Sequence, residues 1–196
     1  MLNSPKTTVQ NVLVDTTASF GVLIDLGSPQ SEVRSSSFSH TGRDAIHFLS
    51  DQGVARDNTI NQTSYDGIFS QDTHQIKISD NTITGAYYGI RLIRVTNATV
   101  SDNTLNFNRA AGLGVFGGGA NTASNNIAKG NFQNGIFTFD STANAFKKNL
   151  LQGNSFYDAE DWSTGSGTVG TANTWTGNKC DVGSPAGLCA APATQP

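Results

Sequence analysis

The chain has 196 residues, a length that suits one domain, and its hydrophobic content of 36% is low for a globular core. Its formal net charge of −3, without a basic patch, argues against nucleic acid or an anionic membrane as a partner. No apolar run is long enough to cross a bilayer, so we expect no membrane partner. The 21 glycines favour short strands joined by tight turns.

An asparagine returns every 22 to 24 residues along most of the chain. The column comprises Asn58, Asn81, Asn103, Asn126, Asn149 and Asn173, and Ser36 holds the equivalent place one period earlier. A period of this size predicts one supersecondary unit repeated along an axis. Stacked asparagines can hydrogen-bond to one another, and asparagine tolerates the left-handed backbone that a tight corner needs. We therefore interpret the column as structural and not as a ligand site.

Three apolar columns accompany the asparagines. Three residues before them stand Val33, Ala55, Ile78, Val100, Ala123 and Phe146. Two residues after them stand Phe38, Ile60, Ile83, Leu105, Ala128 and Leu151, and nine or ten residues after them stand Ile46, Ile68, Ile90, Leu113 and Ile136. These residues belong to short alternating stretches, which is the periodicity of strands. Three strands per period predict a coil of roughly triangular cross-section, with equivalent residues about 4.8 Å apart in successive turns.

Several short motifs recur at equivalent places of the period. They are YDGIF (65–69), SDNTIT (79–84), YGIRL (88–92), SDNTLN (101–106), AGLGV (111–115) and NGIF (134–137). Over roughly residues 9 to 178 the pattern resembles the right-handed parallel β-helix repeat proteins of the pectate-lyase-like superfamily. The resemblance implies an all-β, single-stranded right-handed parallel β-helix of about seven rungs. We expect residues 1–178 to form the β-helix domain and residues 179–196 to form a C-terminal cap and tail.

The C-terminal region carries both cysteines, Cys180 and Cys189, in a Gly- and Pro-rich stretch. We predict a disulfide that staples the tail and indicates an oxidising compartment, so that the protein is secreted or periplasmic; the alternative is two free thiols. The segment 173–189 resembles the ending of many secreted bacterial members of the superfamily, including relatives of the periplasmic copper-maturation β-helix protein.

The segment 158–162 (DAEDW) falls where the next Gly-Ile strand is expected, and its charges are expected to break the strand ladder. Val169 and Trp175 are expected to take inward places on a last partial rung. Trp162, Trp175 and the cysteine loop would then cover the open end of the coil, because the terminal repeats of a solenoid need caps.

The resemblance implies that substrates bind along the face made by the Gly-Ile strands. Alternation places two columns outward on this face, the first with Leu23, His47, Phe69, Arg91, Gly114 and Phe137, the second with Asp25, Leu49, Gln71, Ile93, Phe116 and Phe139. Their apolar members would form one contiguous exposed stripe, which monomers rarely show. Three interpretations stay open: a sugar-stacking groove, a surface for self-association or a partner, and a surface covered by a loop or a missing domain.

Chemistry on a polyuronate needs a cation to neutralise the carboxylate, a base for the C5 proton and an acid for the leaving oxygen. We predict His47, Tyr65 and Arg91 as catalytic residues. The predicted substrate-binding residues are Asp66, Phe69, Tyr88, Phe116, Phe137 and Phe139. His47 and Arg91 would lie two rungs apart, about 9.6 Å, with room for a sugar unit between them. The alternative is that these are ordinary solvated strand residues.

Two families of the superfamily allow a comparison by residue. The segment 65–69 loosely resembles the tyrosine-led strand of alginate epimerases, whereas their Asp-Pro-His segment has no match here, because Asp72-Thr73-His74 carries Thr in the middle. The paired aspartates and the Gly-His-Gly of polygalacturonases have no counterpart.

Metal binding is a further question that the sequence raises. Asp57, Asp80 and Asp102 stack immediately before the asparagines, and calcium could be shared between such carboxylates. The alternative is a row of solvated turn aspartates. The histidines show no spacing that predicts a transition-metal site, so no metal ligand is assigned and the cofactor is unknown.

The sequence thus favours recognition of an extracellular polysaccharide, with processing of the lyase or C5-epimerase type as its catalytic version. One alternative is a non-catalytic assembly or adhesion module that forms a homo-oligomer through the apolar stripe. Another is an accessory of metal maturation, which the tail resemblance suggests.

Overall fold

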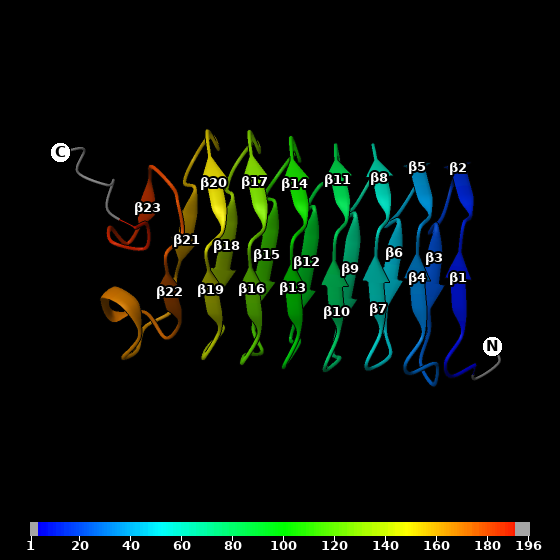
Figure 1. Ribbon diagram of the computed structural model, residues 1–196, viewed down its shortest axis with the longest axis horizontal. Helices are drawn as coiled ribbons and strands as arrows, with labels where there is room; N and C mark the ends of the chain where they lie inside the picture. Colours follow the sequence, from blue (N-terminus) through cyan, green and yellow to red (C-terminus); the bar gives the residue numbers. More distant parts are fainter. Residues whose placement is uncertain (1–3, 191–196) are drawn as a thin grey trace.

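A parallel coil of short strands makes up the computed structural model, which describes residues 4–190 (Figure 1). Each turn of the right-handed coil contributes one strand to each of three sheets, and successive turns stack along the long axis. There are about eight turns where seven were expected. The period that begins at Ser36 leaves out the first turn, which residues 8–24 form.

Sheet A has eight strands. In order along the coil they are β1 (Thr8–Gln10), β4 (Glu32–Arg34), β7 (Val54–Arg56), β10 (Lys77–Ser79), β13 (Thr99–Ser101), β16 (Thr122–Ser124), β19 (Ala145–Lys147) and β22 (Thr174–Thr176). Sheet B has seven strands. They are β2 (Leu13–Thr17), β5 (Ser37–Thr41), β8 (Thr59–Asn61), β11 (Thr82–Thr84), β14 (Thr104–Asn106), β17 (Ile127–Lys129) and β20 (Leu150–Gln152).

Sheet C is made by the Gly-Ile strands. They are β3 (Val22–Ile24), β6 (Ile46–Phe48), β9 (Ile68–Gln71), β12 (Ile90–Ile93), β15 (Leu113–Phe116), β18 (Ile136–Phe139), β21 (Ala159–Asp161) and β23 (Gly183–Ser184). The glycine before these strands allows close approach of neighbouring turns. A Cβ atom on Gly89 would lie 2.6 Å from the carbonyl oxygen of Gly112.

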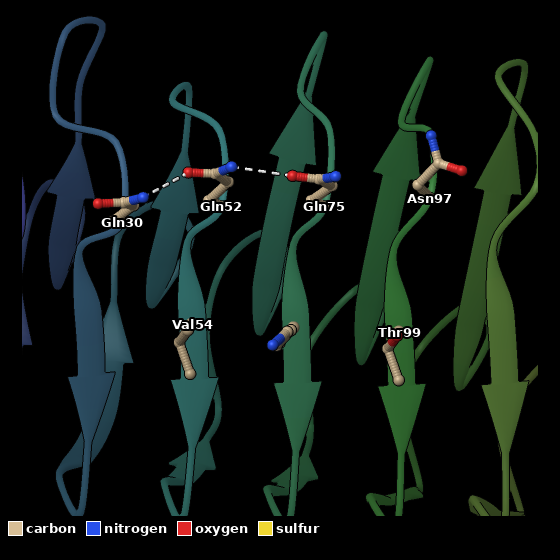
Figure 2. Close-up of a pocket in the computed structure, with 7 residues that line it drawn as sticks. Gln30, Gln52, Val54, Gln75, Asn97 and Thr99 are labelled. Carbon is tan, nitrogen blue, oxygen red and sulfur yellow. Dashed lines mark hydrogen bonds between the residues drawn. The ribbon is translucent and has the colours of Figure 1, made fainter.

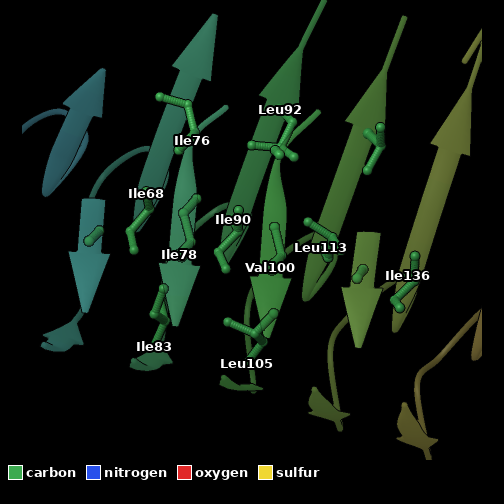
Figure 3. Packing of buried hydrophobic residues seen from close by; sticks show 14 of the residues in the cluster. Ile68, Ile76, Ile78, Ile83, Ile90, Leu92, Val100, Leu105, Leu113 and Ile136 are labelled. Atoms are coloured by element: carbon green, nitrogen blue, oxygen red, sulfur yellow. The ribbon is translucent and has the colours of Figure 1, made fainter. Parts of the chain in front are cut away.

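The core runs along the axis of the coil and consists of the three predicted apolar columns. In sheet C, for example, Ile46 pairs with Ile68 and Ile68 with Ile90. Figure 3 shows these side chains pointing into the interior from facing strands. All three columns are confirmed, because their members follow the strand register and all of them are buried. Stacked aliphatic side chains of equal size fill such a core without voids.

The asparagine column is a hydrogen-bonded ladder. Each side-chain NH2 donates to the side-chain oxygen of the next asparagine at 2.9 to 3.0 Å, through Asn58, Asn81, Asn103, Asn126, Asn149 and Asn178. The expected last member, Asn173, instead ends a second ladder that begins at Asn121. The loop after β21 lengthens the last period to 29 residues, which moves the register from 173 to 178.

The corner conformation also differs from the expectation. The left-handed backbone belongs to the residue before each ladder asparagine, such as Asp57, Asp80 and Asp102, with φ of 56° to 58°. The asparagine itself turns its side chain inward to the ladder. Because the aspartates stand at this exposed corner, they point away from the core.

The segment 159–161 continues sheet C instead of breaking it. Strand β21 pairs with β18 on one side and β23 on the other, and its three residues are buried. The charges are tolerated because they have partners: Asp161 accepts a hydrogen bond from Nε1 of Trp175 at 2.8 Å, while Trp162 Nε1 donates to Glu160 at 2.7 Å.

The last turn carries the cap. Trp175 stacks on Phe146 at a centroid distance of 4.1 Å and closes the core, as expected. Val169 is exposed within the short 3-10 helix η1 (Thr168–Gly170) and does not take the expected inward place. Trp162 lies on the outer face of the coil and does not cover the end as expected.

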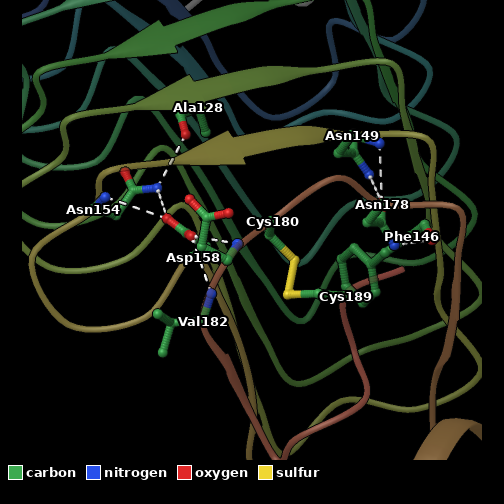
Figure 4. Close-up of a disulfide and its surroundings, with 10 residues drawn as sticks. Ala128, Phe146, Asn149, Asn154, Asp158, Asn178, Cys180, Val182 and Cys189 are labelled. Atoms are coloured by element: carbon green, nitrogen blue, oxygen red, sulfur yellow. Dashed lines mark hydrogen bonds between the residues drawn. A yellow bond between two sulfur atoms is a disulfide. The ribbon is translucent and has the colours of Figure 1, made fainter. Parts of the chain in front are cut away.

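A disulfide joins Cys180 to Cys189, which confirms the predicted staple (Figure 4). Asp158 lies beside it and accepts from Asn154 Nδ2 at 2.8 Å and from the N–H of Asp181 at 2.9 Å. A boundary between 178 and 179 stays a prediction, and residues 191–196 of the predicted tail lie outside the described residues.

Candidate functional site

The outward face of sheet C brings the predicted polar residues into one column. His47 pairs with Phe69 and Phe69 with Arg91, so these three residues occupy successive turns. The register continues through Gly114 and Phe137 and reaches Glu160. The second column is confirmed for Gln71, Ile93, Phe116 and Phe139.

Arg91 rests on a buried carboxylate. Its Nη2 lies 2.7 Å from Oδ2 of Asp66, whose side chain is fully shielded from solvent. Oδ1 of Asp66 accepts the backbone N–H of Tyr88 at 3.2 Å. Burial raises the pKa of Asp66 to about 6, although the Arg91 guanidinium opposes the shift and the Asp44 carboxylate adds to it.

The contact between these two groups is close but not aligned as a hydrogen bond. Asp66 Oδ2 and Arg91 Nε both lack a protein hydrogen-bond partner. A guanidinium has five N–H donors, so Arg91 keeps donors for a ligand while Asp66 holds it over the sheet.

His47 is oriented by a second carboxylate, that of Asp44, three residues before it on the same turn. Nδ1 of His47 lies 2.7 Å from Oδ2 of Asp44, and Oδ1 of Asp44 accepts the N–H of Asp66 at 2.9 Å. A carboxylate at this distance favours the tautomer with hydrogen on Nδ1, an assignment made from the hydrogen-bond network. Nε2 is then left with a free lone pair, which is the form that a general base requires.

Phe69 lies between these two groups and is only 6% exposed. The His47 ring lies 4.6 Å from its centroid, and the Arg91 guanidinium lies 4.9 Å from it on the other side. The expected contiguous exposed stripe is therefore wrong at this position, because neighbours on adjacent turns cover the ring. The same packing joins Phe116 to Phe137, at 5.5 Å, so that both are half-buried.

The tyrosines lie at the corner that leads into sheet C. Tyr88 is half-buried, and its ring lies 5.4 Å from the Arg91 guanidinium and 5.6 Å from the ring of Phe116. Tyr65 is exposed one turn before Tyr87. Among residues 4–190 no hydrogen bond, ion pair or ring contact joins the Tyr65 side chain to His47 or Arg91.

Sequence reasoning named Asp44 as a candidate beside His47 without giving it a defined role, and it did not place Glu160 and Trp162 at this face. Asp44 orients His47, and the signal was available, since Asp44 stands one period before Asp66 directly ahead of an apolar strand. Glu160 and Trp162 extend the face beyond Phe137, and both border a hollow of about 220 Å³.

A larger hollow of about 480 Å³ lies away from this face, over sheet A (Figure 2). Its upper wall is an amide row in which Gln30 donates to Gln52 and Gln52 to Gln75, each at 2.9 Å. These amides are largely satisfied by one another, and Lys77 is the one charged residue in its lining.

Between residues 4 and 190, no three His, Cys, Asp or Glu side chains gather closely enough to hold a metal ion. Asp57 of the predicted aspartate row pairs with Arg56 at 2.7 Å. No helix in this part of the chain has the length and apolar character that crossing a membrane requires.

Two epimerase modules of Azotobacter vinelandii are among the solved structures that are similar to this fold. The A-module of mannuronan C-5 epimerase AlgE4 aligns with a TM-score of 0.67 and 17% identity, over 90% of this chain and 52% of the module chain. The AlgE6 A-module aligns with a TM-score of 0.64 and 10% identity, over 89% and 57%. This chain thus spans little more than half the length of either.

Comparison with curated proteins gave no match. A family model described as a right handed beta helix region matches residues 44–191, most of the chain. Together with the parallel register of all three sheets, this confirms the resemblance to β-helix repeat proteins. The chain belongs to the family of proteins with a right-handed β-helix region.

Proposed function

We propose that the protein recognises an extracellular polysaccharide on the outward face of sheet C and processes uronate units there by a lyase or C5-epimerase type of proton transfer. One observation carries the proposal: His47 and Arg91 flank Phe69 in one outward column, and a separate buried carboxylate holds each of them. Carboxylates that fix the tautomer of a histidine and the position of an arginine are typical of a preorganised site.

The proposed roles follow from the free atoms of each side chain. Arg91 would bind the uronate carboxylate and lower the cost of forming a carbanion at C5. Nε2 of His47 would take the C5 proton. In a lyase, the C4–O4 bond then breaks, a C4=C5 double bond forms and the leaving oxygen takes a proton from Tyr65. In an epimerase, a proton returns to C5 from the opposite face and no bond to O4 breaks.

Asp66 and the aromatic residues would support binding. Asp66 is shielded from solvent and acts through Arg91, whereas Tyr88, Phe116, Phe137 and Phe139 would line the path of the sugar chain. The two structural neighbours are named as mannuronan C-5 epimerases, and this supports a polysaccharide as the ligand class. The disulfide supports a secreted or periplasmic location.

Proton NMR of alginate, polygalacturonate and other polysaccharides incubated with the protein, with and without calcium, tests the proposal. The spectrum distinguishes cleavage, double-bond formation and C5 inversion. We expect a changed spectrum that His47→Ala abolishes. Unchanged spectra, combined with a dimer that Phe139→Asp dissociates, would favour the alternative of a non-catalytic assembly module.

A further inference from the structure

A second candidate site extends from Tyr88, on the turn of Arg91, to Glu160, which lies three turns further, about 14 Å along the coil. It is a hollow of about 220 Å³ at the end of sheet C, and its lining combines four aromatic rings with one carboxylate. The lining residues are Tyr88, Ala111, Gln133, Asn134, Phe137, Phe156, Glu160 and Trp162. Tyr88 and Phe137 border both this hollow and the proposed path of the sugar chain, whereas His47 and Arg91, the groups proposed for proton transfer, do not border it.

The carboxylate is that of Glu160, which is only 8% exposed. Its Oε2 accepts from Nδ2 of Asn134 at 2.5 Å, and its Oε1 accepts from Nε1 of Trp162 at 2.7 Å. Both donors are neutral, and no ion pair within residues 4–190 includes Glu160. A largely buried carboxylate without a counter-charge favours a cationic ligand and disfavours another carboxylate.

The aromatic rings are exposed but held in place. Trp162 is 62% exposed, yet its indole is fixed by the bond to Glu160 and by contacts with Phe137 and Phe139, at 5.9 and 6.0 Å between centroids. The planes of Phe137 and Trp162 stand at 84°, so the two rings form adjoining walls. Phe156, which is 63% exposed, borders the same hollow.

We propose that this hollow binds an organic ammonium group, with Glu160 as the counter-charge and the faces of Trp162, Phe137 and Phe156 as cation–π partners. Cations are attracted to aromatic faces within about 6 Å of the ring centroid, and a carboxylate at the same site adds Coulomb attraction. The hollow is smaller than the roughly 300 Å³ or more of sites for drug-sized ligands, so it fits one amino sugar or one small quaternary amine.

Indole N–H signals in a two-dimensional 1H–15N NMR spectrum provide the test. The chain has two tryptophans, and Trp162→Phe identifies the signal of the one that bonds Glu160. The probes are tetramethylammonium and glucosamine at about pH 6, where an aliphatic amine is protonated. Glucose and N-acetylglucosamine are neutral probes, at matched sodium chloride.

A saturable shift of the Trp162 signal with the charged probes, at least about tenfold tighter than with the neutral probes, is the expected result. A shift with only one charged probe supports the proposal and tells an amino sugar from a small quaternary amine. Equal affinity for charged and neutral probes overturns it, as does the absence of any saturable shift.

Variants of the lining residues distinguish a loss of ligand binding from a loss of folding. Glu160→Gln should weaken binding of the charged probes at least about tenfold, because it removes the charge. Phe156→Ala should weaken binding of the charged probes about three- to tenfold, and it should not open the core, because this side chain is exposed. The Trp162 signal reports binding in this variant, so the test remains available even where Glu160→Gln does not fold. Phe132→Ala is the matched control, because Phe132 is 70% exposed and lies outside this hollow. Unchanged binding in Phe156→Ala and in folded Glu160→Gln would contradict the proposal.

Discussion

Asp66 and Arg91 form an ion pair of 2.7 Å in which the carboxylate has no access to solvent and the guanidinium covers the face of Phe69. The ion pair connects a buried carboxylate at a corner of the coil to a guanidinium on the outer surface. Its charge state therefore affects both the stability of the coil and the group that is proposed to bind the substrate.

The first prediction concerns the pH dependence of stability. Burial raises the pKa of Asp66 from 3.8 to about 6, so the folded state binds this proton more tightly than the unfolded state. The resulting stabilisation is fully present below about pH 4 and is lost as pH rises through about 6. A shift of this size corresponds to about 3 kcal/mol at most.

Asp66→Asn should remove this dependence, because an amide does not titrate. The free energy of unfolding is measured by urea denaturation at pH 4 and at pH 8. The difference between the variant and the wild type should become about 1 to 3 kcal/mol more favourable to the variant at pH 8, because only the wild type loses stability as the pH rises. Asp102→Asn, at an exposed corner, is the matched control. The same difference at both pH values in Asp66→Asn would refute the prediction.

The second prediction concerns the asparagine ladder. The side chain of Asn103 donates to the carbonyl oxygens of Ile78 and Ser101 and to the amide oxygen of Asn126. Asn103→Ala removes these three bonds and takes away the acceptor of the backbone N–H of Asn81 inside the coil, so we expect a loss of at least about 3 kcal/mol in the free energy of unfolding. Asn61→Ala, at an exposed position, should cost less than about 0.5 kcal/mol. Similar losses in both variants would mean that the ladder does not stabilise the coil.

Much of the fold was predictable because the same spacing of apolar residues and asparagines recurs in every turn of the repeat. The register of Ile46, Ile68 and Ile90 follows from their spacing alone, and it fixes which neighbours face outward. Where the repeat ends, this constraint ends too. The six extra residues between the ladder partners Asn149 and Asn178 moved the register, and no repeated pattern marked the insertion.

The site was predictable only in part. Alternation placed His47 and Arg91 on one face. It could not show that the imidazole ring of His47 and the guanidinium of Arg91 would cover Phe69, because that depends on the direction of the side chains. The Asp66–Arg91 pair crosses neighbouring turns, and the sequence does not state which of several nearby carboxylates an arginine selects.

The third prediction concerns the C-terminal cap. The bond between Cys180 and Cys189 closes a short loop, and such a loop restricts the unfolded chain by about 2 to 3 kcal/mol in the chain-entropy description. The double substitution of both cysteines by Ala should lower the free energy of unfolding by this amount. Urea denaturation of the oxidised protein, the reduced protein and the variant provides the comparison. If the reduced protein and the variant are both as stable as the oxidised protein, the cap does not depend on the disulfide.

The last prediction separates the orientation of His47 from its presence. Asp44 Oδ2 holds Nδ1 of His47 at 2.7 Å, so Asp44→Asn should leave the ring in place but disturb its tautomer. If His47 takes the C5 proton, His47→Ala should abolish turnover of the uronate polymer, and Asp44→Asn should reduce kcat at least about 100-fold with little change in KM. Asp72→Asn, which removes an exposed partner of Arg94 after β9, is the control. A loss of activity in Asp44→Asn that only tracks a loss of folded protein would assign Asp44 to the fold alone.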